Sequence, residues 1–122
     1  MKLVAQVQRK PTPQQAQLLR RTMERANKAC DHLSQQAWEE KTFGRYSLHK
    51  VAYHDTRARF PRLSSQVVVR CIAKVSDAYR LSRERKRCFR TEGAIAYDAR
   101  MLTWKGDEGV SIWTVGSRQR IA

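Results

Sequence analysis

The C-terminal part of this chain constrains the fold most strongly. Residues 89–121 hold three short runs of apolar, β-prone residues, and turn residues separate them. Asp98 marks one turn, the stretch 106–109 a second, and Gly116 with Ser117 a third. Short β-prone runs that alternate with turn residues are typical of antiparallel strands joined by hairpins. The sequence therefore predicts a β-meander in this part.

A long helix is predicted from residue 13 to about Lys41. Thr12 is a suitable N-cap, Pro13 fits the first helical position, and Gln15 completes a capping box. An apolar stripe with helical spacing follows, made of Leu19, Met23, Ala26, Cys30, Leu33 and Ala37. Three cations lie on another face of this helix: Arg21, Arg25 and Lys28.

Two shorter helices are predicted to follow. Ser47 is the expected N-cap of the first, which ends at Pro61, and Ser64 or Ser65 caps the second. In the second, apolar residues recur at i, i+3, i+4, i+7 and i+11, namely Val68, Cys71, Ile72, Val75 and Tyr79. This periodicity is a strong indication of a helix with one buried face.

The beginning of the chain completes the predicted fold. Residues 2–9 alternate as a strand does, and a proline-containing segment then ends the strand. A lone strand leaves backbone groups unpaired, and the C-terminal meander is the only predicted sheet with which it can pair. The expected fold class is therefore α+β: a small β-barrel or meander with a bundle of about three helices inserted after the first strand. Residues 1–10 are the first strand of the β domain, 11–87 the helical lobe, and 88–122 the remainder of the β domain.

The charge of the chain indicates its partner. Its 122 residues include 25 lysines and arginines against 11 acids, a formal net charge of +14. A chain this basic is attracted to polyanions, because binding releases their condensed counterions. Nucleic acid is the expected partner, and the alternatives are a basic protein without such a partner and one that binds anionic lipid. No apolar run approaches the roughly 20 residues of a membrane span, and no signal-peptide core is present, so the expected compartment is the cytoplasm.

Cations gather between the predicted helices and the meander. The segment 80–90 carries Arg80, Arg83, Arg85, Lys86, Arg87 and Arg90 against the single acid Glu84. We interpret it as a phosphate-binding segment, together with Arg118 and Arg120 near the C-terminus. The alternative is a solvated linker, which is what runs of like charge usually are.

No catalytic or metal site is predicted. A two-metal nuclease needs several carboxylates that converge on one point. Asp98, Asp107 and Glu108 each lie at a predicted turn, where acids are common. The cysteines are scattered, odd in number and without C-x-x-C spacing: Cys30, Cys71 and Cys88. Buried free thiols are the simplest expectation, and no cofactor is expected.

Several short motifs, in their order and spacing, resemble one protein family. They are Lys10-Pro11-Thr12-Pro13-x-Gln15, Asn27-x-x-Cys30, Leu63-Ser64-x-Gln66 with Ala73…Ala78-Tyr79, and the run from Phe89 to Ile121. The chain resembles, over nearly its whole length, the N-terminal part of the transposon-encoded TnpB (OrfB) proteins. These are RNA-guided DNA nucleases related to the type V CRISPR effectors. The chain departs from the family at Ser117, where glycine is usual, and at Ala122, where proline is usual.

This resemblance implies an architecture and a function. In TnpB proteins a wedge domain, which is a small β-barrel, receives a helical recognition domain after its first strand. A nuclease domain with three metal-binding carboxylates follows, and the family members are several times longer than this chain. The chain is therefore expected to be an RNA- and DNA-binding wedge-plus-recognition module without the nuclease domain, and so not an enzyme by itself. Its expected partners are a structured guide-like RNA and target-adjacent DNA, in the prokaryotic cytoplasm or on the nucleoid. Three origins stay open: a fragment of a longer protein, a shortened or split gene, and one component of a complex whose nuclease domain is a separate chain.

The resemblance also implies a DNA-binding set at the N-terminal ends of the second and third helices. The set comprises His49, Lys50, Ser64, Ser65, Gln66 and Arg70. Helix N-termini also suit phosphate groups physically. Two other functions fit the sequence: a free-standing helix-turn-helix DNA-binding regulator, and a structural subunit of a ribonucleoprotein. RNA dependence separates the module from the regulator, and crosslinking to nucleic acid separates both from the subunit.

Overall fold

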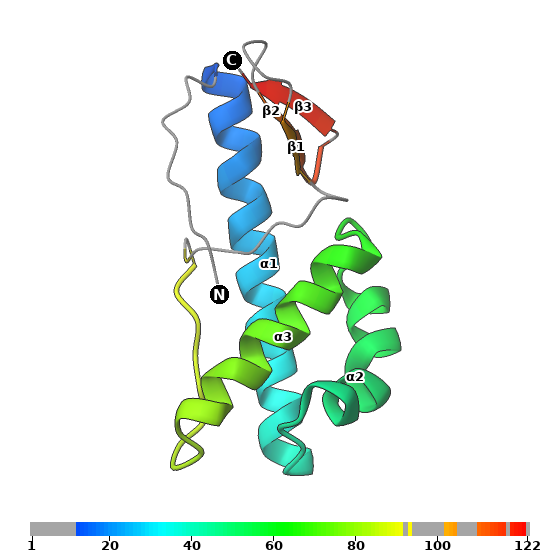
Figure 1. Ribbon diagram of the computed structural model, residues 1–122, viewed down its shortest axis with the longest axis vertical. Coiled ribbons are helices and arrows are strands. Elements are labelled where there is room, and N and C mark those ends of the chain that lie inside the picture. Colours follow the sequence, from blue (N-terminus) through cyan, green and yellow to red (C-terminus); the bar gives the residue numbers. More distant parts are fainter. Residues whose placement is uncertain (1–11, 92, 94–101, 105–109, 117, 122) are drawn as a thin grey trace.

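Among the residues that the structure describes, three helices precede a small antiparallel sheet (Figure 1). The structure is a computed structural model that describes residues 12–91, 93, 102–104, 110–116 and 118–121. Its elements are α1 (Pro13–Glu40), α2 (Arg45–Arg59), α3 (Ser65–Leu81), β1 (Leu102–Trp104), β2 (Val110–Trp113) and β3 (Arg118–Ile121). The strands lie in the order β1-β2-β3, with both neighbouring pairs antiparallel. None of the helices in these ranges has the length and apolar character that crossing a bilayer requires.

The predicted fold class, a β-barrel with inserted helices, is wrong. The helices hold 28, 15 and 17 residues, whereas the strands hold only 3, 4 and 4. Within the described ranges the strands form an open sheet and no barrel. The prediction closed the barrel with a strand at residues 2–9, which lies outside the described residues. In the structure a helix, α1, covers the sheet instead, so burial of its apolar side chains needs no second layer of strands.

The ends of α1 follow from local chemistry. The Gln15 N–H donates to Thr12 Oγ1 over 3.1 Å, and the Thr12 N–H donates to Gln15 Oε1 over 3.0 Å. This capping box satisfies two of the N–H groups that a helix start leaves without partners. At the other end, Lys41 takes the left-handed conformation with φ 51°, and the Thr42 N–H donates to the Ala37 carbonyl over 2.9 Å. The predicted limits of this helix are therefore confirmed.

The two shorter helices differ in how well their starts were predicted. Ser64 caps α3, and its side chain accepts a hydrogen bond from the Val67 N–H over 3.3 Å, as expected. α2 begins earlier than expected, with Gly44 rather than Ser47 at the N-cap. Gly44 has no side chain with which to cap, so the first N–H groups of α2 lack a side-chain partner.

The core lies where α1, α2 and α3 meet. α1 contributes small residues such as Ala26, Ala29 and Ala37, which let the other helices approach closely, with Leu33 filling the space between them. The periodic set predicted for α3 is buried in full: Val68, Cys71, Ile72, Val75 and Tyr79. Burying a side chain the size of Leu33 contributes about 1.5–3 kcal/mol, so this cluster carries most of the apolar stabilisation.

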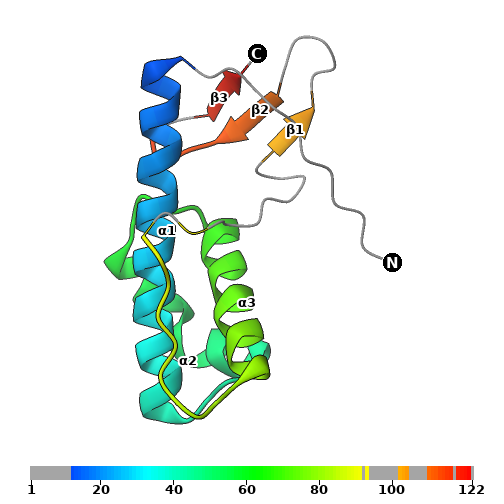
Figure 2. The same cartoon turned by 90° about the vertical axis from the view of Figure 1, so that its left-hand side faces the viewer.

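The sheet rests on the N-terminal half of α1, on the same side of the helix as α3 (Figure 2). Ile112 and Ile121 are buried against Leu19. The Thr22 hydroxyl donates to the Leu18 carbonyl over 2.7 Å and accepts from the Val115 N–H over 3.0 Å. α1 is therefore shared: its first half packs on the sheet and its second half on α2 and α3.

Candidate nucleic-acid interface

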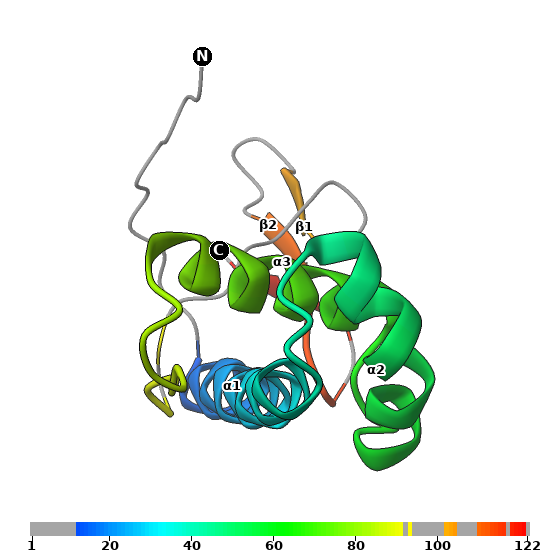
Figure 3. The same ribbon diagram turned by 90° about the horizontal axis from the view of Figure 1, so that it is seen from below.

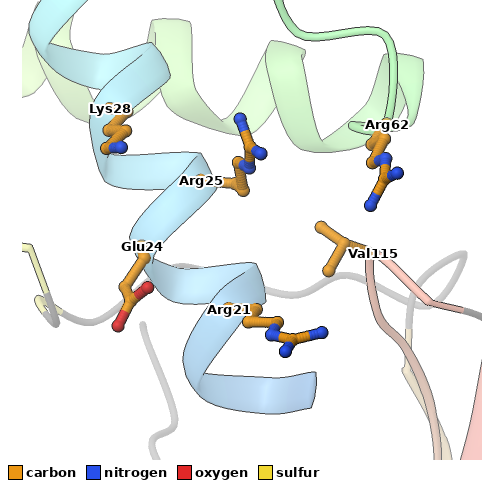
Figure 4. A pocket seen from close by; sticks show the side chains of 6 residues that line it. All are labelled: Arg21, Glu24, Arg25, Lys28, Arg62 and Val115. Carbon is orange, nitrogen blue, oxygen red and sulfur yellow. The ribbon is translucent and has the colours of Figure 1, made fainter. Parts of the chain in front are cut away.

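A basic cleft lies between α1, the α2–α3 loop and the segment after β2 (Figure 4). Its volume is about 290 Å³, and its lining consists of Arg21, Glu24, Arg25, Lys28, Arg62 and Val115. We call this set the basic cleft. A smaller hollow of about 150 Å³ adjoins it, shares Arg25 and Arg62, and continues along Phe60, Pro61 and Leu63. The positive surface therefore extends from α1 onto the loop before α3.

Helical spacing and the anchoring of the α2–α3 loop bring together the cations of the basic cleft. Arg21, Arg25 and Lys28 are spaced i, i+4 and i+7, which places them on one face of α1, away from its buried stripe. Arg62 is brought to them by the α2–α3 loop. Arg57 Nη1, from α2, anchors this loop by donating to the Leu63 carbonyl over 2.6 Å. Leu63 itself is buried in the core.

The charge of the basic cleft is not neutralised internally. Among the described residues that line it, four are cations and one, Glu24, is an acid. Within the described part of the chain, none of these four cations forms an ion pair or a hydrogen bond. Cations held close together without counter-charges repel one another and create a positive potential that attracts anions. The arrangement therefore suits an anionic ligand that spans several positive groups.

The predicted phosphate-binding segment is a fixed strap along α1, not a free linker. We call residues 82–91 the strap; they run back beside α1 (Figure 2). Lys86 Nζ donates to Gln35 Oε1 over 2.7 Å, and the Phe89 N–H donates to Asp31 Oδ1 over 2.8 Å. Figure 3 shows the strap and α2 on opposite sides of α1. The strap therefore presents its cations on a defined flank of the molecule.

A buried polar cluster holds the middle of the strap. The Arg87 N–H donates to the Tyr79 hydroxyl over 3.0 Å, and the Ser34 hydroxyl donates to the Arg87 carbonyl. Tyr79 and Ser34 are also hydrogen-bonded to each other over 2.7 Å, and both are buried. Since both backbone groups of Arg87 are bonded to the helices, its position is fixed by the fold.

The predicted phosphate-binding side chains differ in availability. Arg85, Lys86 and Arg90 are exposed, and a shallow hollow of about 460 Å³ lies along residues 82 and 84–88. Arg80 lies 4.0 Å from Asp77, and the Arg83 guanidinium lies 5.0 Å from the Phe43 ring centroid. Of the two C-terminal cations, Arg118 is exposed and its Nε donates to Ser111 Oγ over 2.7 Å. The side chain of Arg120 lies outside the described part of the structure.

The predicted DNA-binding residues fall into two places. His49 and Lys50 are exposed in the first half of α2. Ser64, Ser65 and Gln66 begin α3, immediately after Arg62 of the basic cleft, and Arg70 follows one turn later. α2 and α3 run antiparallel, since Arg45 at the start of α2 lies 3.6 Å from Asp77 near the end of α3. The two helix starts are therefore about 20 Å apart along the pair and do not form one patch.

Sequence reasoning missed the basic cleft as a site. The spacing of Arg21, Arg25 and Lys28 was visible in the sequence, and their clustering opposite an apolar stripe was the signal that could have identified them. No sequence signal pointed to Arg62, because its place beside α1 depends on how the α2–α3 loop packs. No sequence signal identified Glu24 as part of the site either.

The three cysteines are free thiols, and they differ in burial. Cys30 and Cys71 are buried as expected, and the Cys71 thiol donates to the Ala26 carbonyl over 3.4 Å. A hydrogen bond with Cys71, followed by burial, raises the pKa of the Cys30 thiol well above its ordinary value. Cys88 is exposed on the strap, contrary to the expectation that all three are buried. No group of three potential metal ligands occurs among the residues that the structure describes, and Asp98, Asp107 and Glu108 lie outside them.

Comparisons with protein-family models, with characterised proteins and with solved structures find no match to this chain. The resemblance to TnpB proteins therefore depends on the short motifs in the sequence.

Proposed function

We propose that this chain binds nucleic acid through its phosphate backbone, with the basic cleft as the main contact. One observation carries the proposal: Arg21, Arg25 and Lys28 from α1 meet Arg62 from a distant loop, and no ion pair among the described residues neutralises them. Phosphates along a nucleic-acid strand are regularly spaced anions and suit such a row of cations. The exposed cations of the strap, on another flank of α1, extend the contact surface.

The resemblance to TnpB proteins supports a more specific form of this proposal. In that form the chain binds a structured guide-like RNA and target-adjacent DNA in the prokaryotic cytoplasm, and a separate chain supplies nuclease activity. The start of α3 next to Arg62 then brings Ser65 and Gln66 toward DNA held in the basic cleft. A DNA-binding regulator would bind its DNA equally well without RNA, so RNA dependence tests this form.

Our first prediction concerns the basic cleft. The double substitution Arg25→Gln with Arg62→Gln removes the two cations that the basic cleft shares with the adjoining hollow. We expect weaker binding to a hairpin RNA and to a duplex DNA of equal length. The slope of log affinity against log salt concentration should also become smaller in magnitude by about one for each lost phosphate contact. Fluorescence anisotropy across a range of salt concentrations measures both effects.

A charge-matched variant controls for net charge. Lys41→Gln with Arg59→Gln removes the same charge from exposed positions outside the basic cleft: Lys41 ends α1, and Arg59 pairs with Asp55 at 3.3 Å. This control should bind almost as the unchanged protein does. If both double variants lose the same affinity, the attraction is a general effect of net charge and the basic cleft is not the site. If the unchanged protein shows no salt-dependent binding, nucleic acid is not the partner.

A further inference from the structure

An apolar groove lies between the first half of α2 and one face of α3. Its volume is about 680 Å³, and its lining consists of Arg45, Tyr46, Ser47, His49, Lys50, Val69 and Ile72. We call this set the apolar groove. Val69 and Ile72 come from the middle of α3, and the remaining lining comes from the first half of α2. None of these residues lines the basic cleft, so the two are separate surfaces.

Tyr46 is the most unusual residue of the apolar groove. Its side chain is 93% exposed, whereas Tyr79 is fully buried and Tyr53 is half-buried. Tyr46 has no ring contact within the described ranges, while the neighbouring His49 is stacked on Tyr53 at a centroid distance of 4.5 Å and an interplanar angle of 5°. A large aromatic ring left in solvent beside an apolar hollow offers a flat apolar face on which another ring can stack.

The rim of the apolar groove is positive. Arg45 and Lys50 line it, and none of the described lining residues is an acid. Asp77 of α3 lies 3.6 Å from Arg45, but both side chains are more than half exposed, so the pair is weak. Tyr46 and Lys50 are spaced i and i+4 and therefore lie side by side on α2. An aromatic face beside a cation is the arrangement by which single-stranded nucleic acid is bound without sequence preference.

We propose that the apolar groove binds an unpaired nucleobase, which stacks on Tyr46 while its flanking phosphates contact Lys50 and Arg45. This inference rests on the proposed function and adds to it a class of ligand: a nucleic acid that carries a single-stranded segment next to a structured one. The aromatic face favours a flat base over an aliphatic side chain, and the positive rim favours a phosphodiester chain over a neutral one.

The test uses the full-length protein and three fluorescent hairpins with the same stem. One has a single-stranded overhang, one has the same overhang made of abasic sites, and one is blunt. We expect the overhang with bases to bind about tenfold more tightly than the abasic overhang, the usual order of magnitude for one stacked base. Tyr46→Ala should abolish this difference, and Tyr46→Phe should keep it, because the phenyl ring preserves the stacking face.

The control is Leu81→Ala, which removes a similarly exposed apolar side chain (84% exposed) that does not line the apolar groove, at the C-terminal end of α3, and should change nothing. Because Tyr46 is almost fully exposed, Tyr46→Ala should leave the circular dichroism spectrum unchanged.

Equal affinity for the base-containing and abasic overhangs would overturn this inference while leaving the proposed function intact, since the blunt hairpin would still bind. If the unchanged protein binds none of the three hairpins, both this inference and the proposed function are overturned. If Tyr46→Ala leaves hairpin binding intact but abolishes binding of an acidic amphipathic peptide, the apolar groove is a protein-docking site and the inference is wrong.

Discussion

At the scale of single residues, Asn27 joins three parts of the chain. Its side chain is 1% exposed, and its Nδ2 lies within hydrogen-bonding distance of the carbonyls of Met23, Thr91 and Gly93, at 2.9, 3.2 and 2.8 Å. Lys74 Nζ of α3 donates to its Oδ1 over 2.7 Å. One buried amide thus connects α1, α3 and the chain at the end of the strap, and it satisfies carbonyls that would otherwise be costly to bury. This gives Asn27-x-x-Cys30 a structural role, because Cys30, three residues later, lies in the core.

Thiol reactivity should follow this burial. The thiolate is the reactive form of cysteine, and both burial and the hydrogen bond with Cys71 raise the pKa of Cys30, so this thiol stays protonated near neutral pH. Cys71 is buried as well, whereas Cys88 is exposed on the strap. We predict that a thiol reagent such as Ellman's reagent labels one cysteine rapidly in the native protein and three after denaturation. Cys88→Ser should remove the rapid phase; if it persists, one of the buried cysteines is accessible.

At the scale of elements, the strap shows why charge alone did not reveal structure. Residues 80–90 read equally well as a solvated linker, because the groups that bind the strap are spread along α1. Gln35, Asp31 and Asn27 bond in turn to residues 86, 89 and 91. An extended chain advances about 3.3 Å per residue and a helix about 1.5 Å per residue. Roughly two residues of the strap therefore span one turn of α1, so its backbone meets successive turns of the helix. Helix caps such as Thr12 and Ser64 act within a few residues, so they could be predicted from the sequence. The match between the strap and α1 joins residues far apart in the sequence, so it could not be predicted.

Tyr79→Phe tests whether the buried cluster holds the strap. The substitution keeps the ring in the core but leaves the Arg87 N–H and the Ser34 hydroxyl with one partner fewer, at a cost of about 1–3 kcal/mol in the free energy of unfolding. We predict faster amide hydrogen exchange at residues 87–89 than in the rest of the core. Tyr53→Phe is the matched control, since the Tyr53 hydroxyl has no hydrogen bond among the described residues. Equal effects of the two substitutions would show that the cluster does not hold the strap.

At the scale of the whole molecule, the error in the predicted fold and the missed site have the same origin. The sequence indicated the helices because Val68, Ile72 and Val75 repeat with a helical period, and it indicated strands through short β-prone runs. It did not indicate that α1 would cover the sheet, since Leu19 and Thr22 read simply as part of the helix. Because α1 buries the apolar side chains of the sheet, no barrel is needed to bury them. The same docking places Val115 beside Arg21 and Arg25. The site therefore depends on tertiary contacts that local patterns do not contain.

Docking of the sheet on a shared helix predicts that the sheet and the helices unfold together. In a Trp38→Phe variant the remaining tryptophans, Trp104 and Trp113, both belong to strands, so their fluorescence reports the sheet while far-UV circular dichroism reports mainly the helices. The two signals should give the same urea midpoint, as expected for a single cooperative transition.

A second substitution shows whether that coincidence reflects real coupling. Ile112→Ala removes a buried side chain from the contact with Leu19, at a cost of about 2–5 kcal/mol. In the Trp38→Phe background it should lower both midpoints by the same amount, because loss of the sheet exposes the first half of α1 and so weakens the helix on which α3 packs. Leu81→Ala, at an exposed position, should move neither midpoint. If Ile112→Ala shifts only the fluorescence midpoint, the sheet is an independent unit, and the basic cleft, which needs Val115 against α1, would open without unfolding of the helices.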